Sequence, residues 1–337
     1  WTIYNGSKRL KTLKQERLNN QVAELDVATS ENTIKESIAQ IYIQILYAAE
    51  SVRVNENTLQ VSIAQRDRGQ ELLNAGSIAK SDFAQLEAQV STDRYQLVTA
   101  QATLQDYKLQ LKQLLELDGE NEMNVYLPNL SDENVLAPLP AKKDVYVSAL
   151  AIRPEIEASK LNVEASELGI DIAKSSYFPT ISLSAGIGTN HTSGSDFTFG
   201  EQVKNGWNNS IGLSVSVPIF NNRQTKSAVQ KAKLQRETNM LSLLDEQKAL
   251  YKTIESLWLD ANSAQQRYAA ANEKLRSTQI SYDLISEQFN LGMKNTVELL
   301  TEKNNLLQAQ QEQLQAKYMA ILNTQLLKFY QGDKLTL

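Results

Sequence analysis

The 337-residue chain has no cysteine, one histidine and only six prolines. Without cysteine it has no thiol nucleophile, no thiolate metal site and no disulfide framework. His191 stands alone in a polar segment, cannot build a metal site, and is predicted to be a surface residue. The sequence has no nucleophile and base arrangement, phosphate loop or metal-ligand spacing, so we expect neither an enzyme nor a bound cofactor.

Charge and hydropathy exclude two further classes. The formal net charge is −5 and the sequence has no basic run, which argues against nucleic acid as a partner, because a surface that binds nucleic acid has a basic stripe. The longest apolar runs are far shorter than the roughly 18 residues of a membrane-spanning helix. A membrane β-strand needs only about 9 to 11 residues and is not excluded.

Proline is absent from both ends of the chain, and glycine is sparse there. Every proline lies between Pro128 and Pro218, and six of the thirteen glycines lie within residues 186–212. Two long stretches can therefore form uninterrupted helices, and they flank a short segment rich in turns.

The first long stretch predicts an antiparallel helical hairpin over residues 6–117. Apolar residues from Ile34 to Val52 recur at spacings of four and three, which is typical of a helix that packs along one side. A glycine-containing stop separates this helix from a second one, and Ser81 or Asp82 could cap the returning helix. An arm of about 70 residues would be on the order of 100 Å long, because each residue adds about 1.5 Å.

An internal repeat organises the chain. A shift of 216 residues places the first apolar pattern on a second one, and Asn74-Ala75-Gly76 on Asn290-Leu291-Gly292, without insertion or deletion. Residues 221–331 are therefore predicted to form a second hairpin of the same size.

The segment between the repeats has a different composition. Residues 118–151 contain glycine and proline and are predicted to be a linker, and residues 152–178 a helix with Pro154 in its first turn. Residues 179–220 contain two stretches in which aliphatic residues alternate with serine or glycine. This alternation predicts a β-hairpin that could cross a bilayer with its aliphatic side chains toward lipid.

A buried sheet of a soluble protein would show the same alternation. Two strands, with residues 1–5 as the end of another, leave unpaired edges, so closure requires strands from other copies or from an upstream segment. Trp207, in the loop between the two strands, is a candidate for the aromatic girdle at a membrane interface. Because residues 1–5 look like the end of a strand, we expect the chain to lack its true N-terminus.

In their order and spacing these features resemble the TolC-like outer-membrane efflux protein family. The matching motifs are the strand-to-helix elements at residues 2–6 and 217–221, the helix start Ile152-Arg153-Pro154-Glu155, and the two hairpin turns at residues 73–83 and 289–299. The resemblance implies a mainly α fold with a small β part, in which long antiparallel helical hairpins form a trimeric α-barrel. The strands would contribute to a shared 12-stranded transmembrane β-barrel.

The resemblance also implies a location, partners and a function. The location is the outer membrane of a Gram-negative bacterium, with most of the chain in the periplasm. The partners are two further copies in a homotrimer, outer-membrane lipid, a periplasmic adaptor protein and an inner-membrane pump. The function is that of an exit duct in a tripartite efflux or type I secretion system. A non-conducting coiled-coil scaffold or tether in the envelope is the alternative.

The family's periplasmic gate, carried over to this sequence, falls on the two hairpin turns. Ser81 and Asp82 match a Thr-Asp pair, and Phe289 and Lys294 match a Tyr and an Arg that link neighbouring hairpins. Here Phe289 lacks the hydroxyl group and Lys294 lacks the bidentate fork of arginine. Glu298 matches one aspartate of an acidic ring in the lumen. The residues expected to contact the adaptor lie at the hairpin tips: Asn74, Gly76, Ser77, Asn290, Gly292 and Met293.

Each of these residues also has a purely structural explanation. Asp82 can cap its own helix, and Lys294 and Glu298 are four residues apart and can pair along one helix. Gly76 and Gly292 can serve only to reverse the chain. An exposed contact between Asp82 and Lys294 would contribute roughly 0.2 to 1 kcal/mol to closing the tube.

Overall fold

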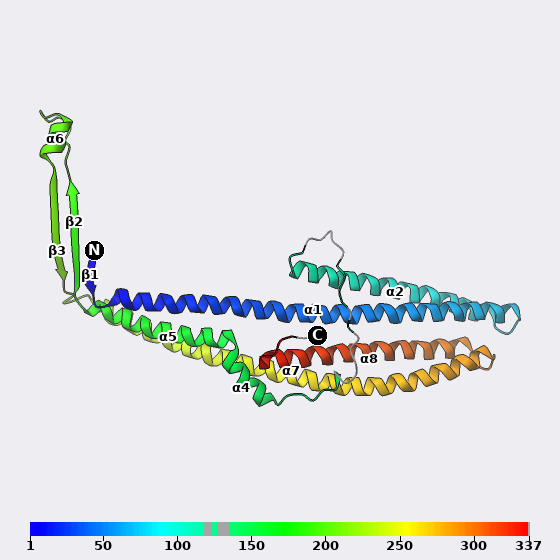
Figure 1. Cartoon of the computed structure of the whole chain (residues 1–337). Helices are drawn as coiled ribbons and strands as arrows, with labels where there is room; N and C mark the ends of the chain where they lie inside the picture. The colour runs from blue at the N-terminus through cyan, green and yellow to red at the C-terminus, as the bar shows by residue number, and fades with distance from the viewer. Residues whose placement is uncertain (118–122, 127, 129–134, 336–337) are drawn as a thin grey trace. The chain divides into compact units, whose positions relative to one another are not determined.

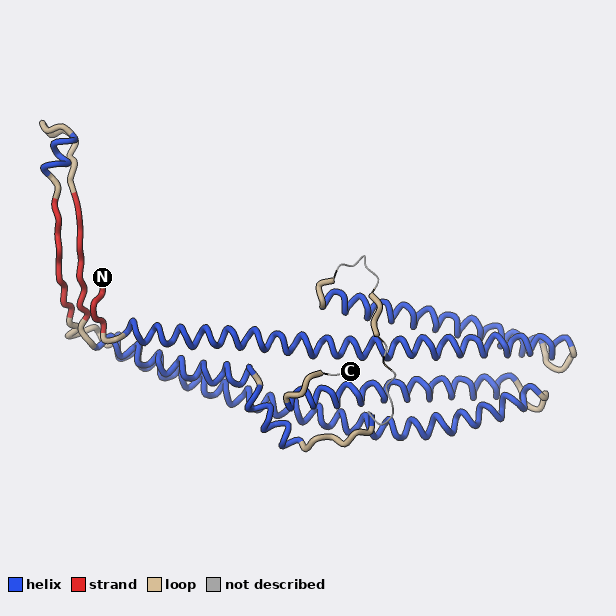
Figure 2. Tube along the Cα trace, in the orientation of Figure 1, coloured by secondary structure: helices blue, strands red, loops and turns tan. Residues whose placement is uncertain are grey.

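The computed structural model describes residues 1–117, 123–126, 128 and 135–335. The chain is mainly helical and has one small sheet (Figure 1 and Figure 2). None of the helices in these ranges has a stretch long and apolar enough to cross a membrane. Its internal contacts divide the chain into two units: unit 1, Trp1–Thr29 with Arg153–Ala249, and unit 2, Ser30–Ile152 with Leu250–Leu337.

Two long helices of equal length contribute residues to both units. They are α1 (Lys8–Asn74) and α7 (Gln224–Asn290), each of 67 residues. A tight turn leads from α1 to α2 (Lys80–Leu114) and from α7 to α8 (Thr296–Gln331). α7 begins 216 residues after α1, and α8 begins 216 residues after α2, so the helix boundaries have the period found in the sequence.

Unit 1 contains the sheet, in which β1 (Thr2–Asn5), β2 (Thr180–Gly188) and β3 (Asn208–Ser216) lie in that order and both pairs are antiparallel. Ile181 pairs with Val215 in this register, and successive pairs keep odd-numbered residues opposite odd-numbered residues. The aliphatic side chains therefore share one face and the serines and glycines the other. The loop between β2 and β3 contains the short helix α6 (Phe199–Asn205).

The rest of unit 1 is helical. α5 (Pro154–Lys174) begins with proline in its first turn and is followed by a 3₁₀ turn, Ser175–Tyr177. It lies beside the first turns of α1 and α7 (Figure 1). The Gln15 side-chain amide donates to the carbonyl of Ala165 at 2.8 Å, and Arg236 pairs with Glu167 at 2.9 Å. These contacts join α5 to both long helices.

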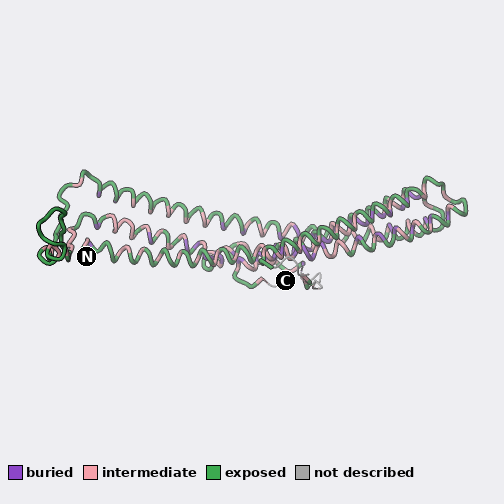
Figure 3. The backbone as a smooth tube through the Cα atoms, turned by 90° about the horizontal axis from the view of Figure 1, so that it is seen from above, coloured by how far each residue is buried: buried purple, intermediate pink, exposed green. Residues whose placement is uncertain are grey.

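The largest buried cluster of unit 2 is centred on the C-terminal half of α8, and buried residues are concentrated in this unit (Figure 3). Apolar residues of α8 from Leu314 to Leu326 pack against Ile43 and Leu46 of α1 and against Tyr268 of α7. A second cluster, the tip cluster, lies near the hairpin turns and draws on all four helices: Leu72, Leu86, Tyr282, Phe289, Leu299 and Leu306.

The segment predicted to be a linker contains a helix, α4 (Lys142–Ile152), which packs against α8. Residues 118–122, 127 and 129–134 of that segment lie outside the described residues. The indole N–H of Trp258 on α7 donates to the carbonyl of Pro140 at 3.0 Å. Lys142 pairs with Glu255 at 3.2 Å, so the start of α4 is fixed to α7. Eleven residues are too few for a periodic pattern to stand out in the sequence.

Candidate functional site

The two hairpin turns have the same backbone geometry. Gly76 and Gly292 have φ of +74° and +75°. In both turns the amide of the next residue, Ser77 or Met293, donates at 2.8 Å to the carbonyl five residues earlier. The amide of each glycine donates to the carbonyl three residues earlier, at 3.0 and 2.9 Å. Together these bonds form the Schellman motif, in which a left-handed residue ends a helix.

Replacing Gly76 or Gly292 with alanine is expected to lower the free energy of unfolding by about 1 to 2 kcal/mol per site, because an L-residue is strained at positive φ. An added Cβ would meet nothing within 4 Å at either position, so the backbone alone sets this penalty. Thermal unfolding of the detergent-purified protein, followed by circular dichroism, measures it. Gly200→Ala is the control, because Gly200 also has open space but no positive φ. An equal loss in the control would contradict the explanation.

The tip residues predicted to contact an adaptor are all exposed: Asn74, Gly76, Ser77, Asn290, Gly292 and Met293. The side chains of Leu291 and Met293 are 69% and 71% exposed. A guanidinium nitrogen of Arg68, on α1, donates at 3.0 Å to the carbonyl of Asn290, at the end of α7. The two tips of one chain are therefore joined, and they present both apolar and polar groups.

Asp82 and Lys294, the predicted gate pair, each have a partner three or four residues away in their own hairpin turn. The Asp82 carboxylate accepts a hydrogen bond from the Ala79 amide at 3.3 Å and so caps α2, whereas Ser81 is exposed. The Lys294 ammonium, in the turn before α8, donates at 2.5 Å to Glu298 in the first turn of α8. In the described part of the chain no hydrogen bond or ion pair joins Asp82 to Lys294.

Glu298 accepts hydrogen bonds from two donors at the start of α8. Besides Lys294, the amide of Asn295 donates to its carboxylate at 3.3 Å, while the Asn295 side chain accepts from the Glu298 amide at 2.9 Å. This reciprocal pair is a capping box. The bond from Lys294, followed by that from Asn295, holds the pKa of Glu298 below its usual value. The side chain is therefore a carboxylate at neutral pH.

This lowered pKa predicts a pH dependence. The Glu298 carboxylate stabilises the folded state fully above its ordinary pKa of 4.5, and this contribution is lost as the pH falls through the lower folded pKa. Glu298→Gln keeps the cap but removes the charge. We expect this variant to melt at a lower temperature than the unmodified protein at pH 7, and at the same temperature once the pH lies below the folded pKa of Glu298. Glu287→Gln is the control; the same pH-dependent difference there would contradict the assignment.

Phe289, the third predicted gate residue, is buried. It is 1% exposed and belongs to the tip cluster, together with Leu86 of α2 and Leu299 of α8. Phenylalanine fits this apolar site better than tyrosine would, because a buried hydroxyl group requires a hydrogen-bond partner. In this chain Phe289 packs the two hairpins together.

A buried ion pair in unit 2 was not singled out in the sequence. Asp93 on α2 and Lys303 on α8 are 1% and 3% exposed. The Lys303 ammonium donates to Asp93 and to the hydroxyl of Ser62 on α1, and that hydroxyl donates to Asp93. Gln89 donates to the other Asp93 oxygen at 2.9 Å. The sequence does hold a signal for this site, because Asp93 interrupts the regular spacing of apolar residues along the second helix.

Burial and pairing with Asp93 shift the pKa of Lys303 in opposite directions. Burial lowers the pKa of the Lys303 ammonium, and the hydrogen bond and charge of Asp93 offset part of that effect. The environment of the pair therefore disfavours charge on Lys303 compared with water. The cost of removing two charges from water therefore offsets much of the attraction between Asp93 and Lys303.

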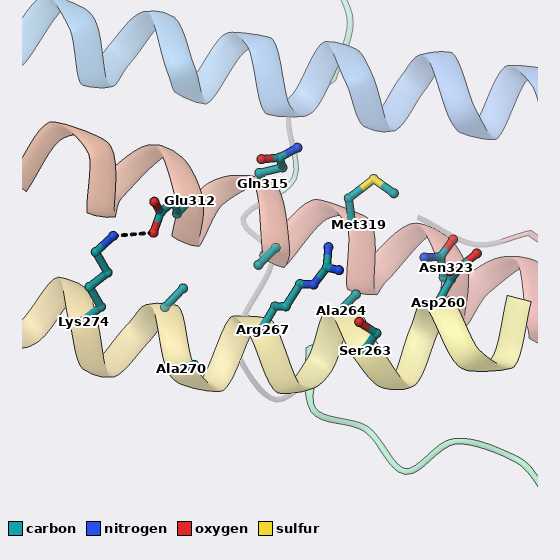
Figure 4. A pocket seen from close by; sticks show the side chains of 12 residues that line it. Asp260, Ser263, Ala264, Arg267, Ala270, Lys274, Glu312, Gln315, Met319 and Asn323 are labelled. Carbon is teal, nitrogen blue, oxygen red and sulfur yellow. Dashed lines mark hydrogen bonds and ion pairs between the residues drawn. The ribbon is translucent and has the colours of Figure 1, made fainter.

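A groove of about 550 Å³ lies between α7 and α8 in unit 2 (Figure 4). Arg267 extends from α7 toward α8, and Lys274 pairs with Glu312 at 2.7 Å. The small side chains that line the groove are Ala264, Ala270, Ala271 and Ala316. Among the described residues no group of three or more His, Asp or Glu side chains could hold a metal ion.

The loop between β2 and β3 is exposed. Trp207, predicted to lie at a membrane interface, is 59% exposed, and Phe197 and Phe199 are exposed as well. A ring nitrogen of His191 lies 3.1 Å from the side-chain oxygen of Gln202, and the imidazole makes an edge contact with Phe199. The environment of His191 is that of a surface residue.

The chain matches a family model and several curated proteins. The model for the outer membrane efflux protein family matches residues 145–332, more than half of the chain. The outer membrane protein TolC of Escherichia coli (strain K12) is 25% identical over 336 residues, which cover 96% of this chain and 66% of TolC. The outer membrane efflux protein BepC of Brucella suis biovar 1 (strain 1330) is 25% identical over 294 residues, 87% of this chain and 61% of BepC. The chain thus spans less than two thirds of the length of these relatives.

The structure resembles solved structures as well. A crystal structure of CusC matches 99% of this chain and 76% of the CusC chain, with a TM-score of 0.84 and 18% sequence identity. At this identity the similarity shows a common fold. It confirms the predicted fold class, mainly α with a small β part. Together with the family match, these observations establish that the chain belongs to the outer membrane efflux protein family.

Proposed function

We propose that the chain is part of an outer-membrane exit duct in a tripartite efflux or type I secretion system. The observation that supports this most directly is the exposed aliphatic face of the sheet, where Ile211, Leu213 and Val215 are 84%, 66% and 59% exposed. Exposing apolar surface to water costs about 25 cal/mol per Å², whereas lipid accepts such a face. The relatives are named as outer-membrane proteins, and we extend that location to this chain.

The proposed assembly is a homotrimer in which three copies share a 12-stranded β-barrel and an α-barrel. The sheet supports it, because β1 and β3 leave edges that must be paired within lipid. The groove between α7 and α8 supports it too. Its alanine side chains leave room for the ridge of another helix, as expected where helices of neighbouring copies pack.

In this proposal the duct opens at the hairpin turns. A periplasmic adaptor and an inner-membrane pump engage the exposed tips, and the pump supplies the energy. Asp82 and Lys294 are only partly buried, so each can exchange its partner in its own hairpin turn for one on a neighbouring copy. Three copies of Glu298, ionised at neutral pH, would form an acidic ring that favours cations.

Reconstitution in planar bilayers tests this function. We expect the full-length protein to form channels, and the double variant Asp82→Ala/Lys294→Ala to conduct more than the unmodified protein, because a closing contact is lost. The matched control is Asp245→Ala/Lys248→Ala, which removes an exposed pair away from the turns. Absence of conductance in every variant, with cross-linking that stops at dimers, would contradict the duct and favour the scaffold.

A further inference from the structure

Unpaired cations are concentrated at the starts of α1 and α7. Ten of the 34 basic residues lie in residues 8–17 and 223–236, where Glu16 is the only acidic residue. Neither segment is a continuous basic run, and both belong to unit 1. Eight of the ten are exposed and make no ion pair within the described ranges; we call them the basic cluster: Lys8, Arg9, Lys14, Arg17, Arg223, Lys226, Lys231 and Lys233.

Helix packing accounts for the other two cations. Lys11 pairs with Asp171 at 3.8 Å and Arg236 with Glu167 at 2.9 Å, so α5 supplies acidic partners to both long helices. The basic cluster has no such role. Lys8, Arg9 and Lys226 also oppose helix formation, because they lie in the first turns of α1 and α7, where cations are unfavourable and no acidic residue is present. The internal energetics of the fold do not explain these residues.

The position of the basic cluster, next to the ends of the strands, indicates a ligand outside the chain. Asn5 pairs with Thr180, and Thr180 pairs with Ser216, so all three strands have one end in common. α1 and α7 begin just beyond that end (Figure 1). Large exposed side chains occupy the short connections there: Tyr177, Phe178, Ile219 and Phe220, which are 54%, 51%, 95% and 83% exposed.

Along the chain, three kinds of surface therefore follow one another. An aliphatic strand face comes first, then exposed aromatic and aliphatic residues at the strand ends, then cations in the first three turns of the helices. The same order describes half a bilayer, from hydrocarbon through the interface to the charged headgroups. Lysine and arginine stems are long enough to reach back toward that surface.

We propose that the basic cluster binds the anionic phosphate-bearing headgroups of the phospholipid leaflet on the helical side of the membrane. The proposal rests on the outer-membrane location proposed above. Charge complementarity selects the ligand, since several Lys and Arg residues next to a membrane strand attract anionic lipid. Residues in the first two turns contribute most, because screening by salt limits the attraction to about 8 to 10 Å.

Lipid retention by the detergent-purified assembly tests the site. The cluster variant combines Lys8→Gln, Arg9→Gln, Lys226→Gln and Lys231→Gln. The matched control removes the same number of exposed lysines and arginines elsewhere: Lys80→Gln, Arg94→Gln, Lys143→Gln and Lys252→Gln. Native mass spectrometry compares bound phosphatidylglycerol with phosphatidylcholine of the same acyl chains. We expect the unmodified and control proteins to bind more phosphatidylglycerol than phosphatidylcholine. In the cluster variant the ratio of the two bound lipids should fall about tenfold.

Three outcomes would overturn the proposal: no preference in the unmodified protein, an unchanged preference in the cluster variant, or an equal loss in the control. Circular dichroism and the oligomeric state of each variant establish that all have folded. Insertion into vesicles of pure phosphatidylcholine separates the headgroup site from the proposed function. The cluster variant and the unmodified protein should insert there equally, and failure of both would contradict the membrane location instead.

Discussion

Lys303→Met is expected to lower the free energy of unfolding by roughly 3 to 5 kcal/mol, because it leaves the Asp93 carboxylate buried without a counter-charge. Asp93 would keep its bonds from Ser62 and Gln89, but neither donor carries a charge. Asp93→Leu is expected to destabilise the protein by a similar amount, since the Lys303 ammonium then lacks its anion.

Replacing both partners gives a different expected result. In the double variant Asp93→Leu/Lys303→Met neither position carries a charge, and well-packed apolar residues often match or exceed the stability of a buried ion pair. Burial already lowers the pKa of Lys303, which indicates that desolvation outweighs the attraction of Asp93. We therefore expect the free energy of unfolding of the double variant to be higher than that of the unmodified protein, or lower by no more than about 1 kcal/mol.

Denaturant unfolding in detergent, followed by circular dichroism, measures all four members of this cycle. The coupling free energy between the two positions should be large, because each single change breaks the same contact. Single variants as stable as the unmodified protein would show that the pair is hydrated, contrary to its burial. A double variant as unstable as either single one would show that the pair is a net stabiliser.

Phe289→Ala is the second change with a large expected effect. Phe289 is 1% exposed in the tip cluster, so its truncation leaves a cavity between the two hairpins and should lower the free energy of unfolding by about 3 to 5 kcal/mol. The control is Leu291→Ala at the same turn. Leu291 is 69% exposed, and its truncation should change stability by no more than about 0.5 kcal/mol.

The two variants also separate packing from gating at this position. If Phe289 acted only through a contact with a neighbouring copy, Phe289→Ala would leave the unfolding of the purified chain unchanged and alter conductance alone. A loss of stability shows that the residue packs the tips within one chain. The same unfolding measurement as for the ion pair decides between these outcomes.

Much of the fold could be predicted because its signals are local. The spacing of apolar residues around Ile34 and Val52 depends only on the helical period, and the alternation in β2 and β3 only on the period of a strand. Gly76 and Gly292 mark the ends of their helices because a left-handed residue there favours glycine. α4 was missed, because its eleven residues follow a proline-rich segment and are held by contacts with α7 and α8.

The sequence by itself determined the repeat, the two long hairpins, the strand pair and the family, since each follows from a periodicity or a motif along the chain. The tertiary structure decided which side of a helix is covered and which charges meet. It buried Phe289 and joined Asp93 to a lysine 210 residues away, and it left eight cations without an acidic partner among the residues that the structure describes. The physical reason is that burial and pairing depend on neighbours from distant segments, which no local pattern specifies.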